Sequence, residues 1–149
     1  MSAVDRLLAT HRPGDERLRV LSASGQLGYG IVTSSFEAGL AQYPHFIGCD
    51  MGSIDPGPYY LGSGQMAAPR DMVRRDLALV LQAARALDIP LVIGSAGTAG
   101  ARPHLQATVD LVLEIAQELD LHFRLATLES DVPAAMLQRA LSEGRLRPL

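Results

Sequence analysis

Leu91-Val92-Ile93-Gly94-Ser95-Ala96-Gly97-Thr98-Ala99-Gly100 is the stretch that decides the fold, because a short apolar run passes directly into a loop of glycine and small polar residues. The whole run, residues 89–93, is apolar on both faces, as is typical of a central strand in a parallel sheet. The same pattern occurs twice earlier, where runs 18–21 and 46–49 precede loops 22–30 and 50–60. Because parallel strands end at the same edge of a sheet, these three loops are predicted to meet at the edge where such sheets bind ligands.

Helical patterns separate the predicted strands, and a fourth strand is predicted at residues 122–128. One helix begins near Ser34, a second follows Pro69, and two more are predicted at 104–119 and 132–142. The second carries a buried stripe of Val73, Leu77, Val80, Leu81, Ala84 and Leu87, and the third one of Leu105, Val109, Val112, Ala116 and Leu119. The alternation predicts a single α/β domain over residues 1–149, with residues 1–17 as an extension or short helix. Its architecture is predicted to be a Rossmann-like three-layer α/β/α arrangement with a parallel sheet of about four strands.

Composition excludes several classes of function. The net charge of −3 disfavours a nucleic-acid partner, and no apolar stretch reaches the roughly 18 residues that span a bilayer. The polar N-terminus disfavours a secretory signal, and the single cysteine, Cys49, fits a reducing cytoplasm. The 13 basic residues are all arginine. The absence of lysine excludes a Walker-type phosphate loop and lysine Schiff-base chemistry.

Three residues are candidate catalytic groups. Asp50 closes the second strand and Asp55 follows in the long loop, where carboxylates can serve as general bases, metal ligands or ribose acceptors. Both aspartates could instead form turns, which is the competing interpretation for Asp55 above all. His104 opens a helix after the third loop and could act as acid, base or anion contact, or be only an exposed residue at the helix start. No histidine or cysteine spacing predicts a metal site, although Asp50 and Asp55 leave an oxygen-ligated divalent cation open.

The loop glycines and serines are the candidate cofactor-binding residues. Glycine lets the backbone approach a ligand closely and direct amides at an anion, although tight packing of helix on sheet is the competing explanation. The dinucleotide fingerprint is a poor match, with Thr33 at its final glycine position. A CoA thioester and a nucleotide are the two cofactor classes that these loops suit. The set comprises Ser24, Gly25, Gly28, Gly30, Gly52, Ser53, Gly94, Ser95 and Gly97.

Three segments together resemble the N-terminal part of the acyclic terpene utilisation (AtuA-like) family. They are the loop 22–29, the stretch Asp50-Met51-Gly52-Ser53-Ile54-Asp55-Pro56-Gly57-Pro58-Tyr59-Tyr60-Leu61-Gly62, and Ile93-Gly94-Ser95-Ala96-Gly97. The Asp-Pro-Gly-Pro-Tyr-Tyr element is the specific one. The resemblance implies a catabolic enzyme, or a subunit of one, that acts on a small carboxylic acid or its CoA thioester. Family members are generally much longer than this chain.

Three functions remain in competition at this point. The first is a lyase- or hydratase-type enzyme or subunit acting on a small carboxylic acid or acyl-CoA. The second is a nucleotide- or dinucleotide-binding enzyme that uses the first glycine loop and Asp50. The third is a non-catalytic binding or assembly subunit that completes a partner's active site. In each case the expected partners are a small molecule and either a second copy of the chain or a separately encoded subunit, because a four-stranded sheet leaves two open edges.

Overall fold

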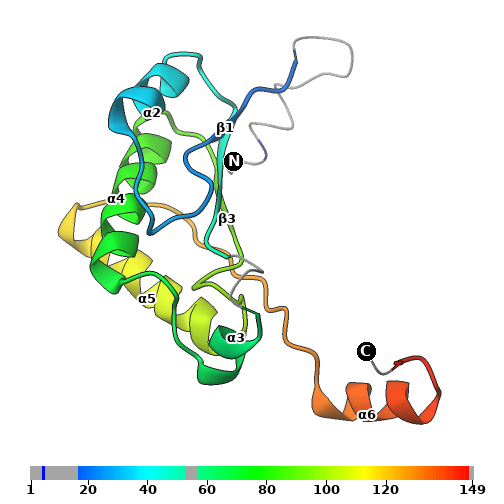
Figure 1. The fold of residues 1–149 in the computed structure, drawn as a ribbon. Coiled ribbons are helices and arrows are strands. Elements are labelled where there is room, and N and C mark those ends of the chain that lie inside the picture. The colour runs from blue at the N-terminus through cyan, green and yellow to red at the C-terminus, as the bar shows by residue number, and fades with distance from the viewer. Residues whose placement is uncertain (1–4, 6–16, 53–56, 148–149) are drawn as a thin grey trace.

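A three-stranded parallel sheet lies at the centre of the fold (Figure 1). The structure is a computed structural model that describes residue 5 and residues 17–52 and 57–147. Strand β2 (Phe46–Asp50) lies between β1 (Val20–Ser22) and β3 (Leu91–Gly94), and both pairings are parallel. The three predicted apolar runs therefore form adjacent strands, and the expectation of an α/β fold with a parallel sheet is confirmed.

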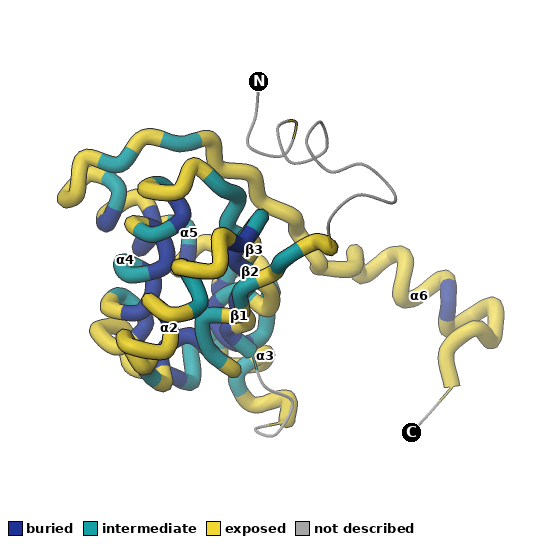
Figure 2. The backbone as a smooth tube through the Cα atoms, turned by 90° about the horizontal axis from the view of Figure 1, so that it is seen from above, coloured by how far each residue is buried: buried dark blue, intermediate teal, exposed yellow. Residues whose placement is uncertain are grey.

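Helices pack against only one side of this sheet in the described part of the chain. Figures 1 and 2 show α2 (Thr33–Leu40), α4 (Arg70–Ala86) and α5 (Arg102–Glu118) on one side of the strands. The short helix α3 (Tyr59–Ser63) precedes α4, while α6 (Ala134–Ser142) stands apart on the opposite side. Because the sheet grows in one direction from β1 to β3, crossovers of a single hand place the connecting helices α2 and α4 on the same face.

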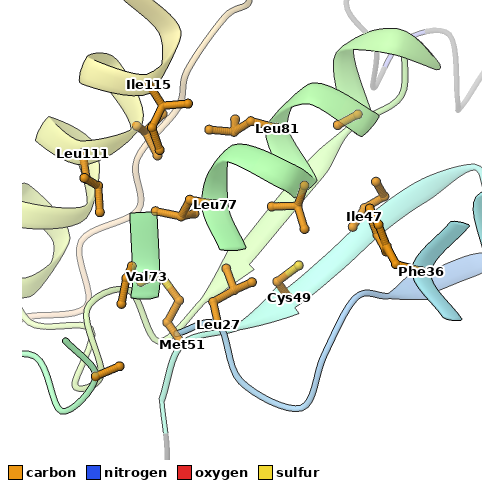
Figure 3. Close-up of a cluster of buried hydrophobic side chains, with 14 residues drawn as sticks. Leu27, Phe36, Ile47, Cys49, Met51, Val73, Leu77, Leu81, Leu111 and Ile115 are labelled. Atoms are coloured by element: carbon orange, nitrogen blue, oxygen red, sulfur yellow. The ribbon is translucent and has the colours of Figure 1, made fainter. Parts of the chain in front are cut away.

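The core fills the space between the sheet and α4 (Figure 3). Ile47 and Cys49 of β2 are buried, and alternate residues of the flanking strands join them. The predicted stripe of α4 is confirmed at five positions, since Val73, Leu77, Val80, Leu81 and Ala84 are all buried. Leu87 falls outside it, because the helix ends at Ala86 and the side chain is 37% exposed.

Helix α5 packs on α4 with a different face from the one predicted. Of the predicted set only Val112 is buried, and the buried face consists of His104, Thr108, Leu111, Val112 and Ile115. Both possible stripes of this helix are largely apolar, and the true one begins with two polar residues, so periodicity alone selected the wrong one. Ion pairs from Arg70 to Glu114 and from Arg74 to Glu118 join the exposed surfaces of the two helices.

The predicted fourth strand is wrong. Residues 121–133 form no helix or strand, and Leu125 and Leu128 are exposed. A strand exists only where a neighbouring strand completes its hydrogen bonds, and β3 pairs only with β2 in the part of the chain that the structure describes. We call residues 121–133 the connecting segment, because it joins α5 to α6.

The second face of the sheet is not covered by any described element. Val20 and Val92 point to this face and are 52% and 56% exposed. The described residues therefore form two layers of helix and sheet rather than the predicted three-layer arrangement. The predicted N-terminal extension lies outside the described residues, except for Asp5 and Arg17. In the described ranges, no helix is long and apolar enough to cross a membrane.

Candidate functional site

The loops that follow the three strands meet at one edge of the sheet. The Leu27 N–H in the first loop (residues 22–30) donates to the Asp50 carbonyl oxygen at 2.8 Å. The Met51 N–H in the second loop donates to the Gly94 carbonyl oxygen at 3.1 Å, where the third loop (residues 94–100) begins. These backbone bonds join all three loops, as the sequence predicts. We call the edge of the sheet formed by these three loops, residues 22–30, 50–60 and 94–100, the carboxyl edge.

Asp50 lies at the middle of the carboxyl edge and is exposed. Its Oδ1 atom accepts hydrogen bonds from the backbone N–H groups of Met51 at 2.8 Å and Gly52 at 3.0 Å. The carboxylate therefore forms the turn that was the competing interpretation, yet it remains at the solvent-facing end of β2. Asp55 and Ser53, which were also predicted as site residues in this loop, lie outside the described residues.

His104 is not at the exposed edge, because its side chain is 0% exposed beneath the third loop. Its Nε2 atom lies 2.9 Å from the Tyr60 carbonyl oxygen, and because a carbonyl oxygen only accepts, Nε2 carries the proton. The Nδ1 atom is buried and has no hydrogen-bond partner among the described residues. This arrangement joins α5 to α3 and does not bring the imidazole together with Asp50. In this place His104 positions the loops around it.

The first glycine loop is held by an internal carboxylate. Asp76 on α4 is 1% exposed, and its Oδ2 atom accepts the backbone N–H groups of Gly28 at 2.8 Å and Gly30 at 2.9 Å. The sequence predicted that these N–H groups would bind a phosphate. They donate instead to the carboxylate of Asp76. Sequence reasoning missed Asp76, although a signal was present: it lies three residues after Val73 and four before Val80, on the buried stripe of α4.

Several loop glycines are required by close packing. A Cβ atom at Gly52 would lie 2.4 Å from the Ser95 Cβ, and one at Gly97 would lie 2.6 Å from the His104 carbonyl oxygen. Gly25 and Gly94 differ, since a Cβ there would meet nothing closer than 3.7 Å. Close packing therefore explains Gly52 and Gly97, whereas Gly25 and Gly94 leave room at the edge.

Two serines also lie in these loops. Ser95 is exposed directly after β3, with a φ of 45° that non-glycine residues rarely adopt. Ser24 is partly buried, and its hydroxyl oxygen has no hydrogen-bond partner within the described ranges. Both hydroxyls come from the loops that form the carboxyl edge, where hydroxyl groups can donate to or accept from a ligand.

Two arginines flank the carboxyl edge. Arg75 is adjacent to the first loop, where its Nη2 atom lies 3.0 Å from the Cβ position of Gly30, and its side chain is 58% exposed. Arg102 begins α5 after the third loop, pairs with Glu129 at 2.8 Å and is 69% exposed. Exposed guanidinium groups suit planar carboxylates and phosphates, which they can bind through two parallel hydrogen bonds. Neither arginine was predicted from the sequence as a site residue.

Cys49 lies in the core and is not a reactive group of this edge. Burial raises the pKa of the Cys49 thiol from 9.0 to about 11, so the thiol is neutral at physiological pH and is not an activated nucleophile. Among the residues that the structure describes, no group of three or more His, Cys, Asp or Glu side chains could hold a metal ion.

No family model, curated protein or solved structure matches this chain. The resemblance to the AtuA-like family therefore stays a prediction that depends on the segments quoted for it.

Proposed function

We propose that this chain is an enzyme, or one subunit of an enzyme, that binds a small carboxylic acid or its CoA thioester at the carboxyl edge and catalyses a lyase- or hydratase-type reaction. The observation that carries the proposal is the exposed Asp50 carboxylate at the junction of three loops, with the exposed Arg75 beside the first loop and the exposed Arg102 directly after the third. The resemblance to AtuA-like proteins supports the same substrate class.

The proposed roles follow from the chemistry of each group. Arg75 and Arg102 bind the negative charge of the acid or of the CoA phosphates, because their guanidinium groups stay charged at any physiological pH. Asp50 acts as the acid or base that adds a proton to, or removes one from, the carbon adjacent to the substrate's carbonyl group. The turn hydrogen bonds use Oδ1, so we assign proton transfer to Oδ2. Asp55 keeps its predicted role as a second acid–base group.

The hydrogen bonds of the first loop argue against the alternative function, a nucleotide-binding enzyme that holds phosphate with this loop. A dinucleotide site would use the amides of Gly28 and Gly30, and both donate to Asp76 instead. The third alternative, a non-catalytic assembly subunit, is favoured by one observation, the uncovered apolar face of the sheet with Val20 and Val92 exposed. A chain that binds acyl-CoA but never converts it would support that alternative.

A thermal-shift panel tests the proposal. The purified chain is heated with short branched acids, their CoA thioesters, free CoA, NAD and ATP, each with and without Mg²⁺. A ligand present at 100 times its Kd stabilises the fold by about 2.7 kcal/mol, so a true ligand raises the melting temperature measurably. Stabilisation by acids or acyl-CoA, but not by NAD or ATP, is the expected result, followed by turnover of the stabilising compound.

Matched variants place the ligand on the molecule. Asp50→Asn and Arg102→Gln should abolish the shift. Asp110→Asn and Arg70→Gln should preserve it, because Asp110 is an exposed residue of α5 and Arg70 is in an exposed ion pair like that of Arg102. If no acid or thioester stabilises the parent protein, or if Asp50→Asn binds like the parent, the proposal is wrong.

A further inference from the structure

No described element covers the second face of the sheet, which we call the open face. It carries alternate residues of all three strands: Val20, Ser22, Phe46, Gly48 and Val92. The other face of the same strands is buried under α4, with Ile47 at 0% exposure. Parallel sheets occur almost only with both faces covered, so an apolar open face implies a covering element.

One described element exposes a matching apolar surface. Helix α6 exposes Met136, Leu137 and Leu141 at 58%, 42% and 60%, and these residues lie along one side of the helix at helical spacing. Its polar residues, Gln138, Arg139 and Ser142, lie elsewhere around the helix. A single amphipathic helix of nine residues is marginal in water without packing, so α6 needs a surface against which to fold.

The connecting segment places α6 at the carboxyl edge. It leaves the C-terminal end of α5, where the Leu121 N–H donates to the Ala116 carbonyl oxygen, and returns to the third loop. There the Ser130 hydroxyl donates to the Gly100 carbonyl oxygen at 3.0 Å, and Asp131 accepts the Arg102 N–H at 2.8 Å. Helix α6 thus begins three residues beyond a fixed point, at the edge from which helices of α/β sheets run back along the strands.

The same anchor directs α6 away from its own sheet. Only Val132 and Pro133 separate Asp131 from the helix, and Pro133 is extended, with φ −57° and ψ 135°. The residue before a proline is also restricted to extended conformations. Two extended residues therefore separate α6 from its anchor at Asp131. Figures 1 and 2 show α6 projecting from the body of the molecule and not lying over its own open face.

We propose that α6 packs on the open face of a second copy of this chain, in a reciprocal exchange about a two-fold axis. The exchange makes two equal helix-on-sheet contacts, which helps it approach the ~1,200–2,000 Å² that stable interfaces bury. Gly48 is at the centre of the open face between Ser22 and Val92, and the Phe46 ring lies 3.7 Å from the Cβ position of Gly48, so Leu137 or Leu141 would pack against the Phe46 ring and Val92. Exchange of one element between protomers is a low-cost route to a dimer.

Oligomeric state and matched variants test this interface without reference to any ligand. Light scattering at micromolar concentration should give about twice 15.9 kDa. Leu137→Asp should weaken association roughly tenfold or more, because it buries an unpaired charge in the contact. The control Gln138→Asp makes a similar change of charge one residue along α6 and should leave the dimer intact. Far-UV circular dichroism of both variants verifies that the α/β body remains folded.

Cross-linking then locates the contact. Leu137→Cys and Val92→Cys proteins, when mixed and oxidised, should form a covalent heterodimer, while each protein alone and the parent with its buried Cys49 should not. A monomeric parent overturns the proposal. So does a Leu137→Cys/Val92→Cys double variant that cross-links only within one chain, because its own α6 would then cover the face. A dimer unaffected by Leu137→Asp would place the interface elsewhere and would also overturn it.

Discussion

Replacing Asp76 tests how the first glycine loop is held. The side chain is 1% exposed, and one oxygen, Oδ2, accepts the N–H groups of both Gly28 and Gly30. Asp76→Ala leaves these two amides without an acceptor in a buried or half-buried place. Each orphaned donor costs about 1–3 kcal/mol, so the free energy of unfolding should fall by about 2–6 kcal/mol. That is a large part of the ~5–15 kcal/mol by which domains are stable.

Asp76→Asn separates the hydrogen bonds from the charge. An amide oxygen in the place of Oδ2 can still accept both N–H groups, while the attraction to Arg75 is lost. The expected loss is therefore smaller than for alanine, about 1–3 kcal/mol, because hydrogen bonds to neutral acceptors are weaker than those to charged ones. Asp110→Ala, on the exposed surface of α5, is the control and should change stability by less than about 0.5 kcal/mol.

Urea unfolding followed by far-UV circular dichroism measures these differences, since the chain has no tryptophan for fluorescence. Asp110→Ala should be the most stable of the three variants, Asp76→Asn should be less stable, and Asp76→Ala should be the least stable. If Asp76→Ala unfolds at the same urea concentration as the parent protein, the carboxylate does not support the loop.

Further predictions concern the core and the third loop. Gly97→Ala should cost about 2–5 kcal/mol, because its φ is +63° and the new Cβ would lie 2.6 Å from the His104 carbonyl oxygen. Gly94→Ala, with no contact closer than 3.7 Å, should unfold within about 1 kcal/mol of the parent, and equal losses for both would contradict this view of the loop. The Cys49 thiol should react with a maleimide only as the protein unfolds in urea; rapid labelling of the native chain would contradict its burial. Because burial raises the pKa of folded Cys49 to about 11, its contribution to stability should be complete below pH 9.0 and lost as the pH rises through about 11, which urea unfolding at a series of pH values measures.

The parts of the fold that follow from local sequence were predicted well. The apolar runs at 46–49 and 89–93 became β2 and β3 with shifts of one or two residues, because each run ends at a glycine- or aspartate-containing loop. Pro69 correctly marks the start of α4, since a proline is tolerated where helical N–H groups lack partners. The meeting of the loops at one edge followed from the parallel order alone.

The parts that depend on distant partners were not predictable. Residues 122–128 have the composition of a strand, but no strand in the described part of the chain pairs with them. The buried face of α5 begins with His104 and Thr108, and sequence patterns count polar residues as exposed. At the candidate site, Asp50 was found because it ends a strand. Asp76 was missed because its partners, Gly28 and Gly30, lie more than 40 residues away in the sequence.

The most direct test of a ligand site at the carboxyl edge is a titration of ¹⁵N-labelled protein with isovaleryl-CoA, a branched short-chain acyl-CoA, followed by amide NMR shifts. We expect the largest shifts in residues 24–30, 50–52 and 94–102, which form or adjoin the three loops. Residues at the opposite edge, such as Tyr43, His45 and Asp88, should not respond. Shifts confined to that opposite edge, or no shifts at millimolar ligand, would contradict the account.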